Sequence, residues 1–213
     1  IISTAIRLAR KEEMHESLHR QPHNTMLIHI SRYQNWQNTT KKLVLEYVNS
    51  LTESLNNDLP SAPTSIYSIF ERTWYKYYAY VIENISTYLP DDYEDNFLTK
   101  KTFNDVKQLL VEAINGVEVV ALNSDSGDTL EYPENKEKKY IAVGGNKLSR
   151  GFTLEGLTVN YFTRNTNFAD SLLQMGRWFG YRPGYIDCCK LFTTRNNLDK
   201  FDLTTATIEE LEH

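Results

Sequence analysis

The hydrophobic and polar positions along the chain predict helices that alternate with short apolar strands. Apolar residues recur near helical spacing, with polar residues between them, over 5–20, 36–55, 66–88, 103–114 and 168–179. Short apolar runs that do not alternate with polar residues predict buried strands at 26–30, 117–122, 140–143, 157–163 and 185–193. After the last strand we expect a loop and a short helix near 205–211.

This order of elements predicts an α/β fold with a mostly parallel sheet flanked by helices. Strands buried on both faces have continuous apolar runs, and strands that alternate with helices pair in parallel. The stretch 58–100 adds helix without a strand, so we interpret it as a helical insertion between a first part, 1–57, and a core, 101–205. We expect 206–213 to be the end of a helix and the remnant of a tag, and the chain to be an excised fragment.

Composition narrows the class of protein. The chain has 213 residues, 40% hydrophobic and 24% charged, which is typical of a globular protein in water. It has no run of 18 apolar residues, so a membrane span is not expected. The two cysteines, Cys188 and Cys189, are adjacent, which predicts reduced thiols in an intracellular protein and disfavours a metal site built on the pair.

Charge is spread unevenly along the chain. The formal net charge is −5, but residues 139–195 hold eight basic and three acidic residues, a net charge of +5 that leaves −10 for the rest. A net-acidic protein can therefore present one basic face to nucleic acid or to a nucleotide phosphate. The alternative is ordinary fluctuation of charge within a short window.

Candidate chemistry begins where the strand at 140–143 runs into Gly144-Gly145. In open α/β sheets ligands bind beyond the carboxyl ends of strands, and glycines let backbone amides approach a phosphate. The Walker pattern, G-x-x-x-x-G-K-[ST], is absent from the chain, which excludes a phosphate loop of that type.

The sharpest feature is an arginine pair around the end of the helix predicted at 168–179. Arg177 and Arg182 flank Gly180, and Gln174 precedes them. The guanidinium group presents a fixed fork of donors that suits phosphate oxygens, and such arginines neutralise charge during phosphoryl transfer. A surface or salt-bridged arginine is the alternative for Arg177 taken alone.

These motifs resemble those of a known family. Ser149-Arg150-Gly151, followed by a helix with Gln174-x-Gly-Arg177, resembles the last two conserved motifs of superfamily-two helicases, which lie in the second RecA-like domain. The full string 144–185, with the earlier strand motif at 23–32, resembles the Z1 domain family. That family carries an endonuclease label and is regarded as a helicase-like domain of bacterial restriction-modification-type systems, often beside MutL- or MORC-like ATPases.

The resemblance implies a RecA-like helicase C-terminal domain with the helical insertion. It implies an ATP-dependent DNA translocase or helicase-like protein of the bacterial cytoplasm, whose ATP and Mg²⁺ bind mainly to a first RecA-like domain outside this chain. The implied partners are DNA, that N-terminal domain and MutL- or MORC-like ATPase or nuclease subunits. The fragment alone is not expected to hydrolyse ATP, because it has no Walker lysine.

The resemblance also assigns roles to residues. Arginine-finger roles fall to Arg177 and Arg182, and Gln174 is placed beside them at the phosphate or its water. Coupling of the nucleotide edge to the nucleic-acid groove falls to Gly145, Lys147, Ser149, Arg150 and Gly151. The residues expected near bound nucleic acid are Ser31 and Arg32.

Two departures from the helicase pattern stand out. Helicases of this kind space the two arginines by three, whereas these are five apart, so both cannot project alike from one continuous helix of about 3.6 residues per turn. Thr153 occupies the place of the usual acidic residue that contacts the ribose, and Glu155 follows two residues later.

Two other functions stay open. A metal-dependent nuclease needs an Asp and a Glu-x-Lys that converge on a metal; Glu134-x-Lys136 fits the pattern, with Asp125 or Asp128 upstream, but in a polar loop. A catalytically silent module for DNA binding or assembly is favoured by the arginine spacing. The spacing of His15, His19 and His23 could place them on one helix face, although Pro22 is expected to end that helix. His29 is expected to be a core histidine.

Overall fold

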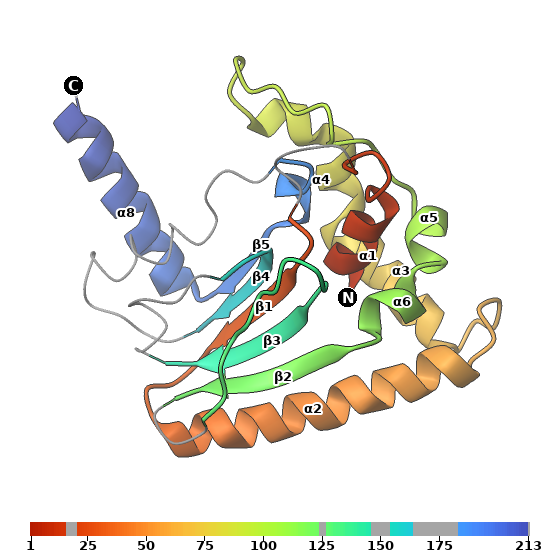
Figure 1. The fold of residues 1–213 in the computed structure, drawn as a ribbon. Helices are drawn as coiled ribbons and strands as arrows, with labels where there is room; N and C mark the ends of the chain where they lie inside the picture. The colour runs from red at the N-terminus through yellow and green to blue at the C-terminus, as the bar shows by residue number, and fades with distance from the viewer. Residues whose placement is uncertain (16–20, 124–126, 146–153, 164–182, 213) are drawn as a thin grey trace.

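The computed structural model describes residues 1–15, 21–123, 127–145, 154–163 and 183–212, and these form an α/β fold on one parallel sheet (Figure 1). Its strands are β1 (Asn24–His29), β2 (Val117–Leu122), β3 (Lys139–Gly144), β4 (Leu157–Phe162) and β5 (Lys190–Thr193). Its helices are α1 (Ile2–Ala9), α2 (Gln34–Asn57), α3 (Ile66–Tyr77), α4 (Ala79–Asn84), α5 (Phe103–Lys107), α6 (Leu110–Ile114) and α8 (Arg195–Glu212), with 3₁₀ turns η1 (Ile85–Tyr88) and η4 (Ile186–Cys188). The expected parallel sheet with flanking helices is confirmed. None of the described helices combines the length and apolarity that crossing a membrane requires.

Strand β1 lies at the centre of the sheet, whose order is β2-β3-β1-β4-β5. Ile28 of β1 pairs with Val143 of β3 on one side and Tyr161 of β4 on the other. The chain leaves β1 toward β2 at one edge, whereas it leaves β3 toward β4 on the opposite side of β1. Neighbouring strands thus send the chain in opposite directions. Their carboxyl ends form a topological switch point, the place where open α/β sheets bind ligands.

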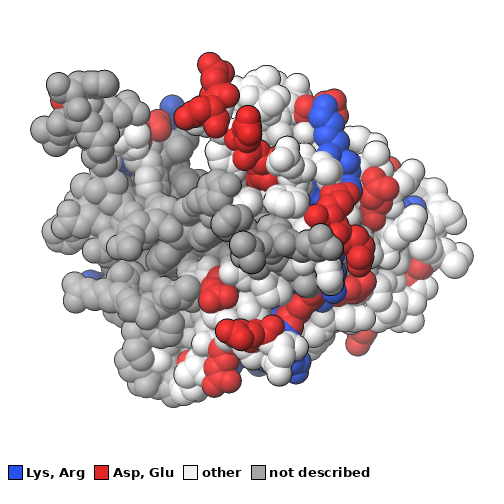
Figure 2. All heavy atoms as spheres, turned by 45° about the horizontal axis from the view of Figure 1, so that its top comes forward, with Lys and Arg blue, Asp and Glu red and all other residues white. Residues whose placement is uncertain are grey.

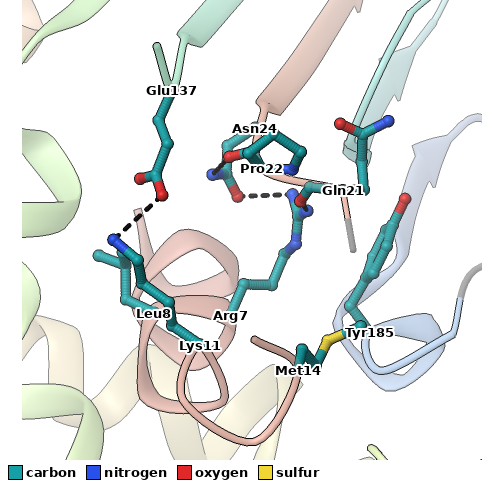
Figure 3. Close-up of a pocket in the computed structure, with 9 residues that line it drawn as sticks. All are labelled: Arg7, Leu8, Lys11, Met14, Gln21, Pro22, Asn24, Glu137 and Tyr185. Atoms are coloured by element: carbon teal, nitrogen blue, oxygen red, sulfur yellow. Dashed lines mark hydrogen bonds and ion pairs between the residues drawn. The ribbon is translucent and has the colours of Figure 1, made fainter. Parts of the chain in front are cut away.

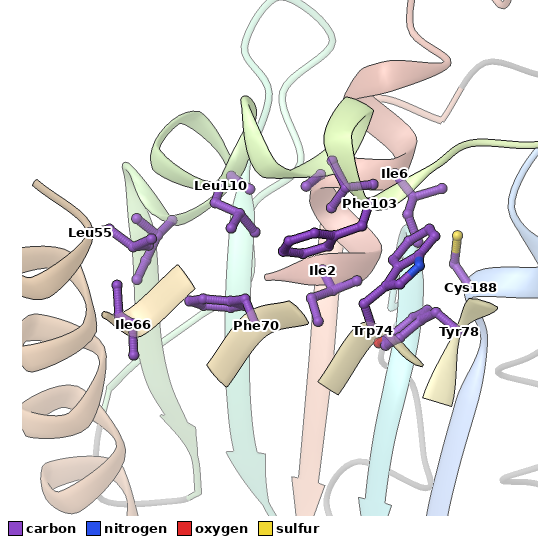
Figure 4. Close-up of a cluster of buried hydrophobic side chains, with 14 of the residues drawn as sticks. Ile2, Ile6, Leu55, Ile66, Phe70, Trp74, Tyr78, Phe103, Leu110 and Cys188 are labelled. Carbon is purple, nitrogen blue, oxygen red and sulfur yellow. The ribbon is translucent and has the colours of Figure 1, made fainter. Parts of the chain in front are cut away.

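The helices α1 to α6 build the larger core on one face of the sheet. Ile28 and Val143 belong to this cluster, together with Trp74 of α3 and Phe103 of α5, whose ring centres lie 6.3 Å apart (Figure 4). Each large side chain buried in this way stabilises the fold by about 1.5–3 kcal/mol. Residues from 58–100, the stretch that we interpret as an insertion, therefore pack directly into the main core.

The opposite face of the sheet has a smaller core. Leu27, Ala142 and Leu157 are buried there, since side chains of neighbouring strand positions alternate between the two faces. This core is covered by Leu130 and Tyr132 from the segment between β2 and β3, and by Phe201 from α8. Both faces are therefore apolar, in agreement with the continuous apolar runs in the sequence.

A buried ion pair corrects the predicted ends of two elements. Helix α1 ends at Ala9, not near residue 20, because Arg10 points into the protein and pairs with Asp187 at 2.7 Å. The strand predicted at 185–193 starts only at Lys190, because Asp187 lies in η4, which presents its carboxylate to Arg10. Both side chains of the pair have no exposed surface.

Three helical predictions need adjustment as well. The stretch 66–88 divides at Tyr78, whose hydroxyl bonds to Ser3 Oγ at 2.9 Å, and 103–114 divides into α5 and α6. The last helix begins at Arg195, not near 205, because Thr194 caps it: Asn197 N donates to Thr194 Oγ1 at 3.3 Å. The helix predicted at 168–179 lies outside the described residues.

Candidate functional site at the carboxyl edge of the sheet

Gly145 brings the carboxyl ends of β1 and β3 into direct contact. A Cβ atom at this position would lie 2.4 Å from Gln37 Nε2, 3.0 Å from Ser31 O and 3.6 Å from Arg32 Cα. A side chain does not fit in that space unless Gln37 moves, so glycine permits the close approach of the two segments. Three of the residues expected in the site, Gly145, Ser31 and Arg32, are therefore neighbours at the switch point.

Gln37, on the first turn of α2, stabilises this corner. Its side chain is 2% exposed, and its Nε2 donates to Ser31 O at 2.9 Å. Ser31 Oγ in turn accepts a hydrogen bond from Tyr33 N at 3.1 Å. The Oε1 atom of Gln37 has no hydrogen-bond partner among the described residues. The sequence analysis missed Gln37, although its place at the start of the helix after Ser31-Arg32 was the signal available.

A cation and two aromatic rings lie on the surface beside this corner. The Arg32 guanidinium lies 4.9 Å from the centre of the Tyr33 ring, and its Nη2 donates to Tyr33 Oη at 2.8 Å. Tyr33 is 57% exposed and Trp36 is 64% exposed. Arg32 is exposed too, and no carboxylate pairs with it among the described residues. This group can therefore meet a ligand without first breaking an ion pair.

The polar groups at the end of β2 have structural partners. Asp128 Oδ2 accepts from Ala121 N at 2.8 Å and from Lys41 Nζ at 2.6 Å. Burial acts to raise the pKa of Asp128, but these two hydrogen bonds hold it below its ordinary value. Asp128 thus accepts a hydrogen bond from a backbone N–H of the edge strand β2, so that N–H is not available to pair with a further strand.

The two motif segments begin at this edge. The chain enters the first one after Gly145, which follows β3, and the second one after Thr163, which follows β4. It re-enters the described structure at Pro183, where Gly184 N donates to Asp95 Oδ2 at 2.7 Å. The remaining predicted site residues lie outside the described residues: Lys147, Ser149, Arg150, Gly151, Gln174, Arg177 and Arg182.

Comparison with known families identifies the family of the chain. A family model described as the Z1 domain matches residues 1–213. The chain belongs to the Z1 domain family. No curated protein and no solved structure gives a significant match. In this Z1 domain the segment 144–185, whose sequence resembles the family, begins at the switch point described above.

The opposite, amino edge of the Z1 domain contains a structural clamp (Figure 3). Arg7 of α1 donates to the carbonyl oxygens of Gln21 and His23 and to Asn24 Oδ1, and its guanidinium lies 4.2 Å from the centre of the Tyr185 ring. The pocket beside it holds about 30 Å³, enough for one or two water molecules and far too small for a nucleotide. Arg7 therefore fixes the entry into β1.

A wider, open hollow of about 680 Å³ lies at the same amino edge, and it contains the Glu134-x-Lys136 pattern. Glu134 lines this hollow, whereas Asp128 contacts β2 near its carboxyl end, so the two carboxylates do not converge on one metal. Asp125 lies outside the described residues. No cluster of three potential metal ligands occurs in the described part of the chain.

The histidines have separate environments. His15 lies in the turn after α1 and His23 in the extended segment before β1, so they do not share a helix face; His19 lies outside the described residues. Burial lowers the pKa of His23 below its ordinary value, against the opposing charge of Glu155, whose Oε2 lies 3.7 Å from Nε2. His29 is buried at the end of β1, and its ring centre lies 5.2 Å from that of Phe162, which confirms its expected place in the core.

The expected basic face is only partly described. Of the eight basic residues in 139–195, five lie outside the described residues. The other three have local partners: Lys139 donates to Glu112 O and Asn115 O, Lys190 to Asp187 O, and Arg195 pairs with Asp199. Figure 2 shows acidic side chains spread over the described part of one face. The described cation at the switch point is Arg32.

Proposed function

We propose that this Z1 domain is the C-terminal RecA-like half of an ATP-dependent DNA translocase or helicase-like protein of a restriction-modification or defence system. One observation carries the proposal: Gly145, which precedes Arg150 of the Arg-Gly motif by five residues, packs on Ser31, the residue before Arg32. A RecA-like motor needs such a contact, because nucleotide-dependent movement of one segment has to reach the segment that holds nucleic acid.

In this proposal the chain supplies charge and positioning, while ATP and Mg²⁺ bind mainly to a first RecA-like domain. Arg177 and Arg182 neutralise charge on the transferred phosphoryl group, and Gln174 orients the phosphate or its water. The segment that contains Ser149, Arg150 and Gly151 relays the change through Gly145 to the start of α2. DNA contacts Ser31 and Arg32, and MutL- or MORC-like ATPase or nuclease subunits are the expected partners.

DNA-stimulated ATP hydrolysis by the natural protein tests this proposal. We expect Arg177→Ala to lower the rate by about 10³-fold or more, the range known for arginine fingers. The control is Arg72→Ala, which removes an exposed arginine of α3, far along the chain from the motifs, and should leave the rate unchanged.

Each outcome separates the candidate functions. Unchanged ATPase activity in Arg177→Ala would reject the finger role. Absence of ATPase activity from the natural protein, with DNA binding intact, would support a silent DNA-binding or assembly module. Asp128 is hydrogen-bonded to β2, whereas Glu134 lines the hollow at the amino edge, so the described residues do not support the nuclease function.

A further inference from the structure

We infer that Arg32, Tyr33 and Trp36 form a platform on which the bases of single-stranded nucleic acid stack. The inference deepens the proposed function and rests on it, since it assigns base stacking to the edge at which nucleic acid is proposed to bind. Neither Tyr33 nor Trp36 was a candidate in the sequence analysis, and the family match assigns no role to either residue.

Two contacts between Arg32 and Tyr33 hold the cation at the ring. The guanidinium of Arg32 lies over the Tyr33 ring at 4.9 Å and also bonds to its hydroxyl, so the cation and the ring are held together before any ligand arrives. Trp36 follows within the first turn of α2. Tyr33 is 57% and Trp36 64% exposed, which leaves ring surface open to a planar ligand.

The chemistry of the group selects single-stranded nucleic acid. Proteins that bind single strands combine positive charge along the backbone with aromatic rings on which successive bases stack. Arg32 supplies the charge and the two rings supply the stacking surface. Duplex bases are already stacked on one another, so the platform favours unpaired bases and tolerates any base sequence, because every base has a π-face.

The test measures anisotropy of a labelled oligo-dT and of an abasic oligonucleotide of equal length with the full protein. Base–aromatic stacking predicts that Trp36→Ala weakens binding of oligo-dT by about 10-fold and leaves binding of the abasic strand unchanged. Trp36→Phe, which keeps an aromatic ring, should recover most of the loss. The matched control is Tyr75→Ala, which removes a ring of similar exposure, 65%, from α3.

The outcomes distinguish this inference from the proposed function. Binding of oligo-dT that does not respond to Trp36→Ala, or equal weakening of both oligonucleotides, overturns the platform while DNA binding stands. If Trp36→Ala loses self-association in sedimentation while DNA binding is unchanged, the Trp36 ring belongs to a contact between protein chains. That result also overturns the platform. A Trp36-dependent preference for bases in a protein without ATPase activity supports the platform and rejects the motor. Failure to bind either strand overturns the platform, whereas the proposed function is decided by the DNA-stimulated ATPase assay.

Discussion

Replacement of Asp187 by Ala should destabilise the protein more than the loss of any surface ion pair. Arg10 and Asp187 have no exposed side-chain surface, and two hydrogen bonds of 2.8 and 2.7 Å join them. Burial acts to lower the pKa of Arg10, but the hydrogen bond with Asp187 raises it above its ordinary value, so Arg10 stays charged in the interior.

The magnitude follows from the donors of Arg10. Its Nε and Nη2 donate to Thr99 O, its Nη1 donates to Gly184 O, and Nη1 and Nη2 each donate to one oxygen of Asp187. Asp187→Ala leaves two donors without acceptors on a buried cation. Breaking a buried pair in this way costs about 3–5 kcal/mol, a large part of the roughly 5–15 kcal/mol by which proteins are stable.

Urea denaturation followed by circular dichroism measures the effect. We expect the midpoint to fall by about 1–2 M, at a slope of about 2–3 kcal/mol/M that does not change. The control, Lys100→Ala, breaks a pair with Glu83 whose side chains are 60% and 66% exposed, and it should cost at most about 1 kcal/mol. An Asp187→Ala protein as stable as the Lys100→Ala protein would refute the reasoning.

Three further predictions concern stability. Gly156→Ala should lower the free energy of unfolding, measured by denaturation, by on the order of 3 kcal/mol or more, because φ is +63° and the new Cβ would lie 1.7 Å from His23 O. Gly116→Ala is the control: φ is +75° but the Cβ would enter open space, so it should cost only about 1–2 kcal/mol. Equal costs for the two variants would reject the clash. Burial lowers the pKa of His23, so the unfolded state binds a proton at this histidine first, and stability falls as the pH drops below the ordinary pKa of 6.5. The difference in stability between the unsubstituted protein and His23→Gln should therefore shrink from pH 7.5 to pH 5.5. A constant difference over this range would contradict the prediction. Gly145→Ala should lower the free energy of unfolding by about 1–3 kcal/mol in the unsubstituted protein, since the new Cβ would meet Gln37 Nε2. The same change should cost distinctly less in a protein that already carries Gln37→Ala. Additive costs of the two changes in the double variant would exclude that contact.

Local patterns were enough to predict the strands but not their order. The apolar run 117–122 became β2 with unchanged bounds, because a continuous run of β-branched and apolar residues suits a strand buried on both faces. That β3 lies between β2 and β1 follows from tertiary packing, for which a single sequence holds no local signal. The switch point therefore became visible only in the fold.

The predicted ends of elements were wrong where long-range contacts determine those ends. Arg10 and Asp187 are 177 residues apart, and their pairing ended one predicted helix early and delayed one predicted strand. In the candidate site, Ser31, Arg32 and Gly145 were expected from the family resemblance. Gln37 lies close to Ser31 and Arg32 in the sequence, but its contact with Gly145 was not predictable, because that contact depends on the adjacency of β1 and β3.

We propose that nucleic acid binds at the carboxyl edge of the sheet, where β1 and β3 end. Hydrogen–deuterium exchange of the natural protein, with and without single-stranded DNA, tests it most directly. Helix α2 begins without a side-chain cap, so the amides of its first turn report binding sensitively. We predict that DNA slows exchange at residues 30–37 and 143–145. Slower exchange confined to the amino-edge hollow, at 21–23 and 132–137, or no change at either edge, would contradict the account.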